Sequence, residues 1–162
     1  MVEGGCMKLF KRISLVLVVC VCVFLMTGCG EKNVEGKLED LMTKMYADIK
    51  EDERPMLANT PVDSENIEYY LGDASIEYEE ALASEPMMGS IAHSVVLVRT
   101  KDGANIEEIK TKIKEKVNPR KWICVGVEKE DVIVENRGNL IVLIMVQDEN
   151  TREKLKTAFN NL

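Results

Sequence analysis

The hydrophobic positions divide the chain of 162 residues into one continuous apolar stretch near its start and a longer region with regular apolar periodicity. Residues 7–12 carry three basic side chains, residues 13–26 are apolar with one exception, and small residues follow. A basic start, an apolar run and small residues at a cleavage point are the parts of a secretory signal peptide. The apolar run of 14 residues is shorter than the roughly 20 helical residues that cross a bilayer core. The pattern therefore predicts a signal peptide over residues 1–28.

Cys29 follows Thr27 and Gly28 directly, and this order resembles the lipobox of bacterial lipoproteins. The resemblance implies that the thiol of Cys29 takes a diacylglycerol, and that cleavage leaves this residue as the first of the mature protein. The alternative for the same stretch is an uncleaved N-terminal anchor helix, and both alternatives tether the following domain outside the cytoplasm. Met7 is the preferred translation start, because Glu3 is out of place in the basic segment of a signal peptide.

Periodicity in the first part of the mature chain is helical. After the lipidated cysteine and a short polar tether at residues 29–36, the apolar spacing predicts an amphipathic helix over residues 38–49. Its apolar residues follow the i, i+3, i+4 spacing of one helix face: Leu38, Leu41, Met42, Met45, Tyr46 and Ile49. Asp63 is expected to open a short helix that ends at Leu71, with Gly72 as its C-cap.

Beyond this point the period becomes that of extended chain. Residues 76–88 alternate between apolar and polar or small side chains, which predicts a half-buried strand. Residues 91–100 contain four consecutive apolar residues, from Val95 to Val98, and predict a central strand that is buried on both faces.

The last third of the chain continues with alternating helices and strands. Residues 106–117 carry a helical apolar stripe, and Asn105 with Glu108 forms a start similar to a capping box. Residues 132–135 and 140–146 predict two strands that a hairpin loop joins. The final predicted helix carries Leu155, Ala158, Phe159 and Leu162.

The order strand, strand, helix occurs twice, and residues 95–113 align without gaps on residues 141–159. Six of the 19 aligned pairs are identical, although two strand-then-helix units can also acquire such similarity by convergence. The two units predict an α+β fold with a four-stranded, mostly antiparallel sheet and both helices on one face. The N-terminal amphipathic helix is an additional element, and residues 37–162 form a single globular domain. In this arrangement Ile109 and Leu155 hold equivalent places in one shared core.

Five segments of this domain keep an order that is typical of one group of lipoproteins. They are Tyr70-Leu71-Gly72, Pro86-Met87-Met88, Val95 to Gly103, Val132-Ile133-Val134 and Arg137 to Leu143. In this order the chain resembles a family of small clostridial (Firmicutes) lipoproteins that is described only as a domain of unknown function. The resemblance implies a lipoprotein domain of similar fold, and no activity, cofactor or site comes with it.

Composition limits the kinds of partner. The formal net charge is −7, and removal of the signal peptide, which carries three basic residues and one acidic residue, makes it −9. Such an acidic domain lacks the basic face that nucleic acid requires. Charge also does not attach it to anionic lipid, so the expected membrane contact is the diacylglycerol on Cys29.

Few residues offer reactive chemistry. Of the five cysteines only Cys124 remains beyond the lipidation site, and its apolar neighbours predict a buried, inert thiol. His93, the single histidine, could be a general base or a metal ligand, but a structural role is the favoured interpretation. No motif for nucleophilic catalysis or phosphate binding occurs, and we expect no cofactor.

Two surface features remain as candidate sites. Glu77, Glu79 and Glu80 form an acidic group that could bind calcium, with simple solvation as the favoured alternative. The adjacent residues Met87 and Met88 could ligate Cu(I) or form an adaptable surface that binds a partner, while core filling at the end of a hairpin is favoured.

Together these features predict a membrane-anchored extracytoplasmic lipoprotein without enzymatic activity, which binds a cell-envelope protein or peptide. The alternative is a small extracytoplasmic protein that binds a ligand or a metal. A hydrolase whose site leaves no sequence motif is a third possibility.

Overall fold

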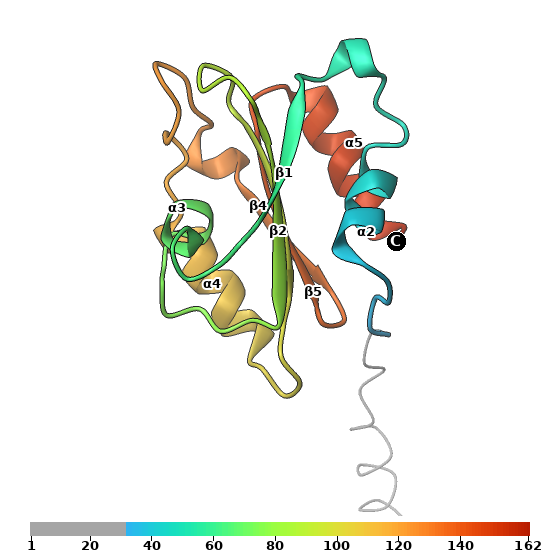
Figure 1. Ribbon diagram of the computed structural model, residues 1–162, viewed down its shortest axis with the longest axis vertical. Coiled ribbons are helices and arrows are strands. Elements are labelled where there is room, and N and C mark those ends of the chain that lie inside the picture. The colour runs from blue at the N-terminus through green and yellow to red at the C-terminus, as the bar shows by residue number, and fades with distance from the viewer. Residues whose placement is uncertain (1–31) are drawn as a thin grey trace, which may run out of the picture. The chain divides into compact units, whose positions relative to one another are not determined.

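The computed structural model describes residues 32–162 as an α+β domain (Figure 1). The predicted signal peptide and the lipidation site at Cys29 lie outside the described residues. Within residues 32–162, no helix is both long and apolar enough to cross a membrane.

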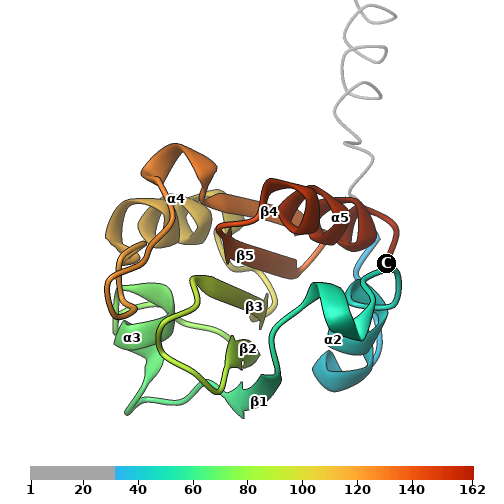
Figure 2. The ribbon, with the colours of Figure 1, turned by 90° about the horizontal axis from the view of Figure 1, so that it is seen from above.

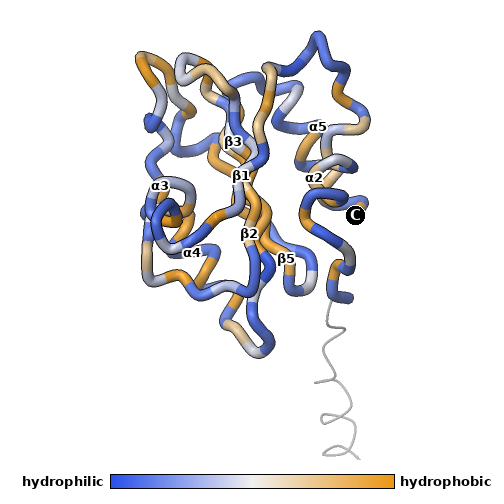
Figure 3. The backbone as a smooth tube through the Cα atoms, in the orientation of Figure 1, coloured by the Kyte–Doolittle hydropathy of each residue, from blue (hydrophilic) through white to orange (hydrophobic). Residues whose placement is uncertain are grey.

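Five antiparallel strands form a single sheet in the order β1-β2-β3-β5-β4. The strands are β1 (Leu57–Pro61), β2 (Glu80–Pro86), β3 (His93–Arg99), β4 (Ile133–Arg137) and β5 (Leu140–Val146). The central strands β3 and β5 are buried along their whole length, so the prediction of a central strand within residues 91–100 is confirmed. Figure 3 shows the apolar residues gathered along the strands in the middle of the domain.

Four α-helices cover the sheet, and they lie on both of its faces (Figure 2). The helices are α2 (Leu38–Met45), α3 (Ile67–Leu71), α4 (Ile106–Lys116) and α5 (Glu149–Asn160), with short 3-10 turns at Glu51–Glu53 and Lys129–Asp131. Helices α3 and α4 pack on one face, and α2 and α5 pack on the other.

The prediction that both strand-following helices share one face is therefore wrong. Ile109 of α4 belongs to one core and Leu155 of α5 belongs to the other. The reason lies in the central strands, which are apolar on both sides. Val96 of β3 faces α4 and its neighbour Val95 faces α5, so a single layer of helices would leave half of these side chains in water.

The sheet also has one strand more than predicted. Strand β1 reads Leu-Ala-Asn-Thr-Pro and has no apolar alternation, which is why the sequence pattern did not reveal it. It lies at one edge of the sheet and pairs only with β2. An edge position is where proline and polar residues are tolerated in a strand, because one side of the backbone needs no partner.

The predicted tether is largely part of the domain. Val34 is buried, and the Arg99 guanidinium donates hydrogen bonds to the carbonyl oxygens of Val34 and Gly36, the second at 2.6 Å. The same guanidinium also donates from Nε to the Glu80 carboxylate at 2.8 Å. A Cβ atom at Gly138 would lie 2.6 Å from the Lys32 carbonyl oxygen, so the β4–β5 hairpin contacts this segment closely.

Candidate functional site

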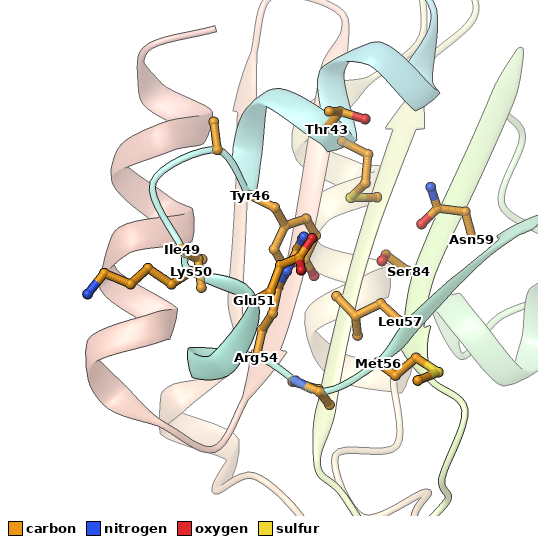
Figure 4. Close-up of a pocket in the computed structure, with 13 residues that line it drawn as sticks. Thr43, Tyr46, Ile49, Lys50, Glu51, Arg54, Met56, Leu57, Asn59 and Ser84 are labelled. Atoms are coloured by element: carbon orange, nitrogen blue, oxygen red, sulfur yellow. The ribbon is translucent and has the colours of Figure 1, made fainter.

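An open groove of about 1020 Å³ lies between α2 and the edge of the sheet at β1 (Figure 4). Helix α2 ends at Met45, and the chain then passes through residues 46–56 before it enters β1. Helix α2 packs against β2, and the same face of β1 and β2 lines the groove at Leu57, Asn59 and Ser84, of which Asn59 is exposed and Ser84 is buried. The groove is lined by Met42, Thr43, Tyr46, Ala47, Ile49, Lys50, Glu51, Arg54, Pro55, Met56, Leu57, Asn59 and Ser84.

A buried polar pair includes Tyr46, which lines this groove. The Tyr46 hydroxyl lies 2.8 Å from His93 Nε2, and the two rings stack with their centroids 5.9 Å apart. Burial lowers the pKa of His93 to about 4, with a smaller contribution from the Arg54 charge, and burial raises the pKa of Tyr46. His93 is therefore neutral at physiological pH, and its hydrogen bond to Tyr46 attaches α2 to the end of β3.

Charged side chains stand at the mouth of the groove. The Arg54 guanidinium lies 5.3 Å from the centre of the Tyr46 ring, a distance that fits a cation–π contact. Within residues 32–162, no carboxylate forms an ion pair with Arg54. The other charged lining residues are Lys50 and Glu51, so the lining carries two positive charges and one negative charge in a protein that is acidic as a whole.

The outer edge of β1 borders the groove and leaves backbone groups without a strand partner. The Met56 carbonyl accepts a hydrogen bond from the Met87 N–H at 3.1 Å, and the Val62 N–H donates to the Ala81 carbonyl at 2.9 Å. Backbone groups of an antiparallel strand point to alternate sides along the chain. Since Met56 and Val62 point toward β2, the N–H and C=O groups of Leu57 and Asn59 point away from the sheet.

A group of exposed apolar side chains lies at the end of the β1–β2 pair, and we call it the methionine end. It consists of Met56, Met87, Met88 and Ile123, whose exposed fractions are 76%, 67%, 61% and 70%. Met56 also lines the groove, so the groove and the methionine end are continuous. The favoured interpretation of Met87 and Met88 as core filling is thus wrong, and their use as a partner-binding surface stays a prediction.

The loop that carries Cys124 also differs from the prediction. Cys124 is exposed and has a φ of 60°, whereas its neighbours predicted a buried thiol. Of the three apolar residues around it, Trp122 is buried in the core at 8% exposure and Val125 packs against the same core, while Ile123 lies on the surface. The apolar run is therefore a loop that contacts the core at both of its ends, and its pattern resembled that of a buried strand.

Lys121 holds this loop on the sheet, and sequence reasoning missed it. Its side chain is 3% exposed and pairs with Glu85 of β2. Its Nζ lies 4.4 Å and 5.0 Å from the ring centres of Tyr69 and Tyr70. Burial lowers the pKa of Lys121, and the Glu85 carboxylate opposes that effect. Lysine is so rarely buried that no residue pattern pointed to this arrangement.

Two of the three acidic residues that were candidate calcium ligands have basic partners. Glu77 pairs with Lys101 at 3.2 Å, and Glu80 pairs with Arg99 at 2.8 Å. In the part of the chain that the structure describes, no group of three or more His, Cys, Asp or Glu side chains could hold a metal ion.

No protein-family model, curated protein or solved structure matches this chain. Inference about function therefore depends on the groove, the methionine end and the N-terminal sequence.

Proposed function

We propose that the protein is a lipid-anchored extracytoplasmic binding module, without enzymatic activity, that holds a segment of a cell-envelope protein or peptide in the groove beside β1. The observation that carries this proposal is the combination of a groove of about 1020 Å³ with an unpaired strand edge along its side. The exposed methionine end extends the same surface. Methionine side chains adapt their shape to a partner, which suits such a contact area.

The chemistry of the groove favours binding over catalysis. His93, the one histidine of the chain, is 3% exposed and is engaged by Tyr46, so it is poorly placed to take a proton from a substrate. Cys124 is not among the residues that line the groove. The groove therefore offers polar side chains that can bind a partner, and none of them is an activated nucleophile.

The short connection to the expected lipid supports a role at the membrane surface. Lys32 follows Cys29 by three residues, and three extended residues span at most about 11 Å. Because the segment after Lys32 is fixed to the domain by Arg99, little free chain remains. A diacylglycerol on Cys29 would hold the groove close to the envelope.

Lipid attachment is testable by itself. Cys29→Ala should abolish metabolic labelling with a palmitate analogue and leave an uncleaved precursor in the cell. Replacement of the exposed Cys124 by Ser is the matched control and should leave labelling unchanged. Equal labelling of the Cys29→Ala variant and the natural protein would contradict the lipidation site.

Binding at the groove is tested in the cell with a photo-crosslinking residue at position 59. We expect a covalent adduct of discrete mass between this position and an envelope protein. The same crosslinker at position 115, which is exposed on α4 on the opposite face of the sheet, should give no such adduct. Equal adducts at both positions, or no adduct at position 59, would contradict the proposed site.

A small extracytoplasmic ligand is the second candidate for the same groove. The Ser84 side chain is buried at the groove floor, near the Tyr46 hydroxyl, and such polar groups can orient a small molecule. The volume lies at the upper limit of the roughly 300–1,000 Å³ that is typical of small-molecule sites. A small-molecule occupant would leave the crosslinker at position 59 without a protein adduct.

A further inference from the structure

We infer that the occupant of the groove is an extended peptide segment that pairs antiparallel with the outer edge of β1 and places a carboxylate against Arg54. This inference rests on the proposed binding function and specifies the occupant.

The backbone edge matches an extended chain. The N–H groups of Leu57 and Asn59 point outward with a spacing of two residues, and so do the carbonyl groups of both residues. Pro61 has no N–H to offer, so donation to a partner strand stops there. Only an extended backbone presents acceptors and donors with this alternation, which is how peptides add to the open edge of a sheet.

The groove receives the side chains of such a peptide. Leu57 and Asn59 both line the groove, so the groove lies on the face toward which their side chains point. A paired strand places every second side chain on that same face. These side chains would enter the space between α2 and β1, and the backbone bonds would supply affinity while the groove supplies selectivity.

The charge of the lining selects a carboxylate. Arg54 has no acidic partner within the described residues, whereas Lys50 lies 3.7 Å from Glu53, and Lys154 lies 2.9 Å from that same carboxylate. The contact of Arg54 with the Tyr46 ring places its guanidinium at the groove. A guanidinium in this position binds a carboxylate with two parallel hydrogen bonds.

The position of Arg54 sets the direction of the peptide. Arg54 precedes the first residue of β1 by three positions, so a peptide that binds it through its free C-terminus has its C-terminal end beside the start of β1. That arrangement makes the peptide antiparallel to β1, in agreement with every other strand pair of the sheet. The carboxylate can be a free C-terminus or an Asp or Glu side chain, and in the second case the peptide continues over the methionine end.

The test is a selection of random nine-residue peptides on the full-length protein in nanodiscs, with empty nanodiscs as the background. We expect enriched peptides that have alternating apolar residues and a carboxylate in their C-terminal half. Fluorescence anisotropy then measures the affinity of each enriched peptide, and hydrogen exchange with mass spectrometry should show slower exchange at residues 56–61. Amidation of the peptide C-terminus, compared with replacement of internal Asp by Asn, identifies which carboxylate is used.

Matched variants separate the two parts of the inference. Arg54→Gln should weaken the binding of an acidic peptide on the order of tenfold. Arg54→Lys should restore part of the lost affinity. Asn59→Pro removes one outward N–H and should weaken binding by a similar factor, whereas Asn59→Ala, which keeps the N–H, should weaken it less. Methylation of the peptide nitrogens that face β1 should abolish binding, while methylation of the alternate nitrogens should not.

Several results would overturn this inference. They are the absence of enrichment over empty nanodiscs, peptides that tolerate methylation at every nitrogen, and a dimer of the chain whose position 59 crosslinks to itself. An adduct with an envelope protein at position 59 together with any of the first two results would leave the proposed function standing and reject only the extended peptide.

Discussion

The rest of the molecule covers the two edges of the sheet to different extents. At the β4 edge all five residues are half-buried, and side chains from the helices on both faces reach it. Lys110 of α4 donates to Asn136 at 2.9 Å, and Lys156 of α5 lies 3.2 Å from Glu135. At the β1 edge Ala58, Asn59 and Pro61 are exposed, and a groove runs alongside.

This difference suggests which edge is available for a partner. An unpaired edge invites pairing with another chain, and natural proteins cover or charge such edges to prevent it. Here the covering is applied to β4, while β1 is a strand of five residues that ends in Pro61, whose carbonyl oxygen accepts a hydrogen bond from the Asn66 side chain. Because the molecule covers the β4 edge and leaves the β1 edge open, the β1 edge is suited to specific binding of a partner.

The largest expected effect comes from detaching α5, which supports the closed edge. Leu155 is fully buried, and truncation of a buried leucine typically costs about 2–5 kcal/mol. Leu155→Ala should lower the free energy of unfolding by that amount in denaturant titrations. Ile109→Ala on the other face should act similarly, and Glu115→Ala, an exposed control, should change little. If Leu155→Ala behaves like the control, α5 does not stabilise the sheet.

The next largest effect is a pH dependence of stability, and it concerns the side of the molecule where the β1 edge is open. The pKa of His93 is lowered to about 4 by burial, whereas an unfolded histidine titrates near about 6.5. Above pH ~6.5 both states are neutral, and between ~6.5 and ~4 only the unfolded state gains the proton. Stability is thus complete at neutral pH and falls by about 3 kcal/mol as the pH approaches 4.

His93→Gln is the matched variant for this prediction, because glutamine does not titrate. The difference in unfolding free energy between the natural protein and this variant should shrink as the pH falls from 7 to 4. Hydrogen exchange at pH 5 should increase first in residues 46–61 and later in β4. A constant difference across this range would mean that His93 is not buried in its neutral form.

The smallest effect on stability is expected at the closed edge itself. The side chains of Lys156 and Glu135 are 37% and 33% exposed, and such pairs contribute about 0–1 kcal/mol. The double variant Lys110→Ala, Lys156→Ala should therefore have a free energy of unfolding within about 1 kcal/mol of that of the natural protein. It should nevertheless self-associate more strongly in analytical ultracentrifugation, because β4 loses its cover. Unchanged association would show that these lysines do not protect the edge.

Much of the sheet and its helices could be predicted because the signals are local. Asn105 accepts a hydrogen bond from the Glu108 N–H at 3.3 Å, as the capping pattern predicted. Gly72 ends α3 with a φ of 81°, a conformation that glycine adopts without strain. The strands β3 and β5 could be recognised because burial on both faces leaves a continuous apolar run.

The groove could not be predicted because it arises from contacts between distant parts of the chain. Asn59 and Arg54 lie in a short segment without helical or strand periodicity, and nothing in their neighbours distinguishes them from loop residues. Their role depends on where α2 packs over the sheet and on the pairing of β1 with β2. The same limit explains the error on the helix faces, since the continuous apolar run of β3 indicates that both of its faces are buried but does not show which helix covers which face.

The Arg99 contact has a mechanical consequence. A pull on the chain before Val34 is transmitted through the guanidinium to β3, which is the middle strand of five. A force applied there must shear hydrogen bonds to strands on both sides, whereas a force applied to an edge strand would peel it away one bond at a time. If Cys29 is lipidated, the domain is attached to the membrane through β3, its strongest element. A load carried by a partner at β1 then passes through β2 before it reaches β3.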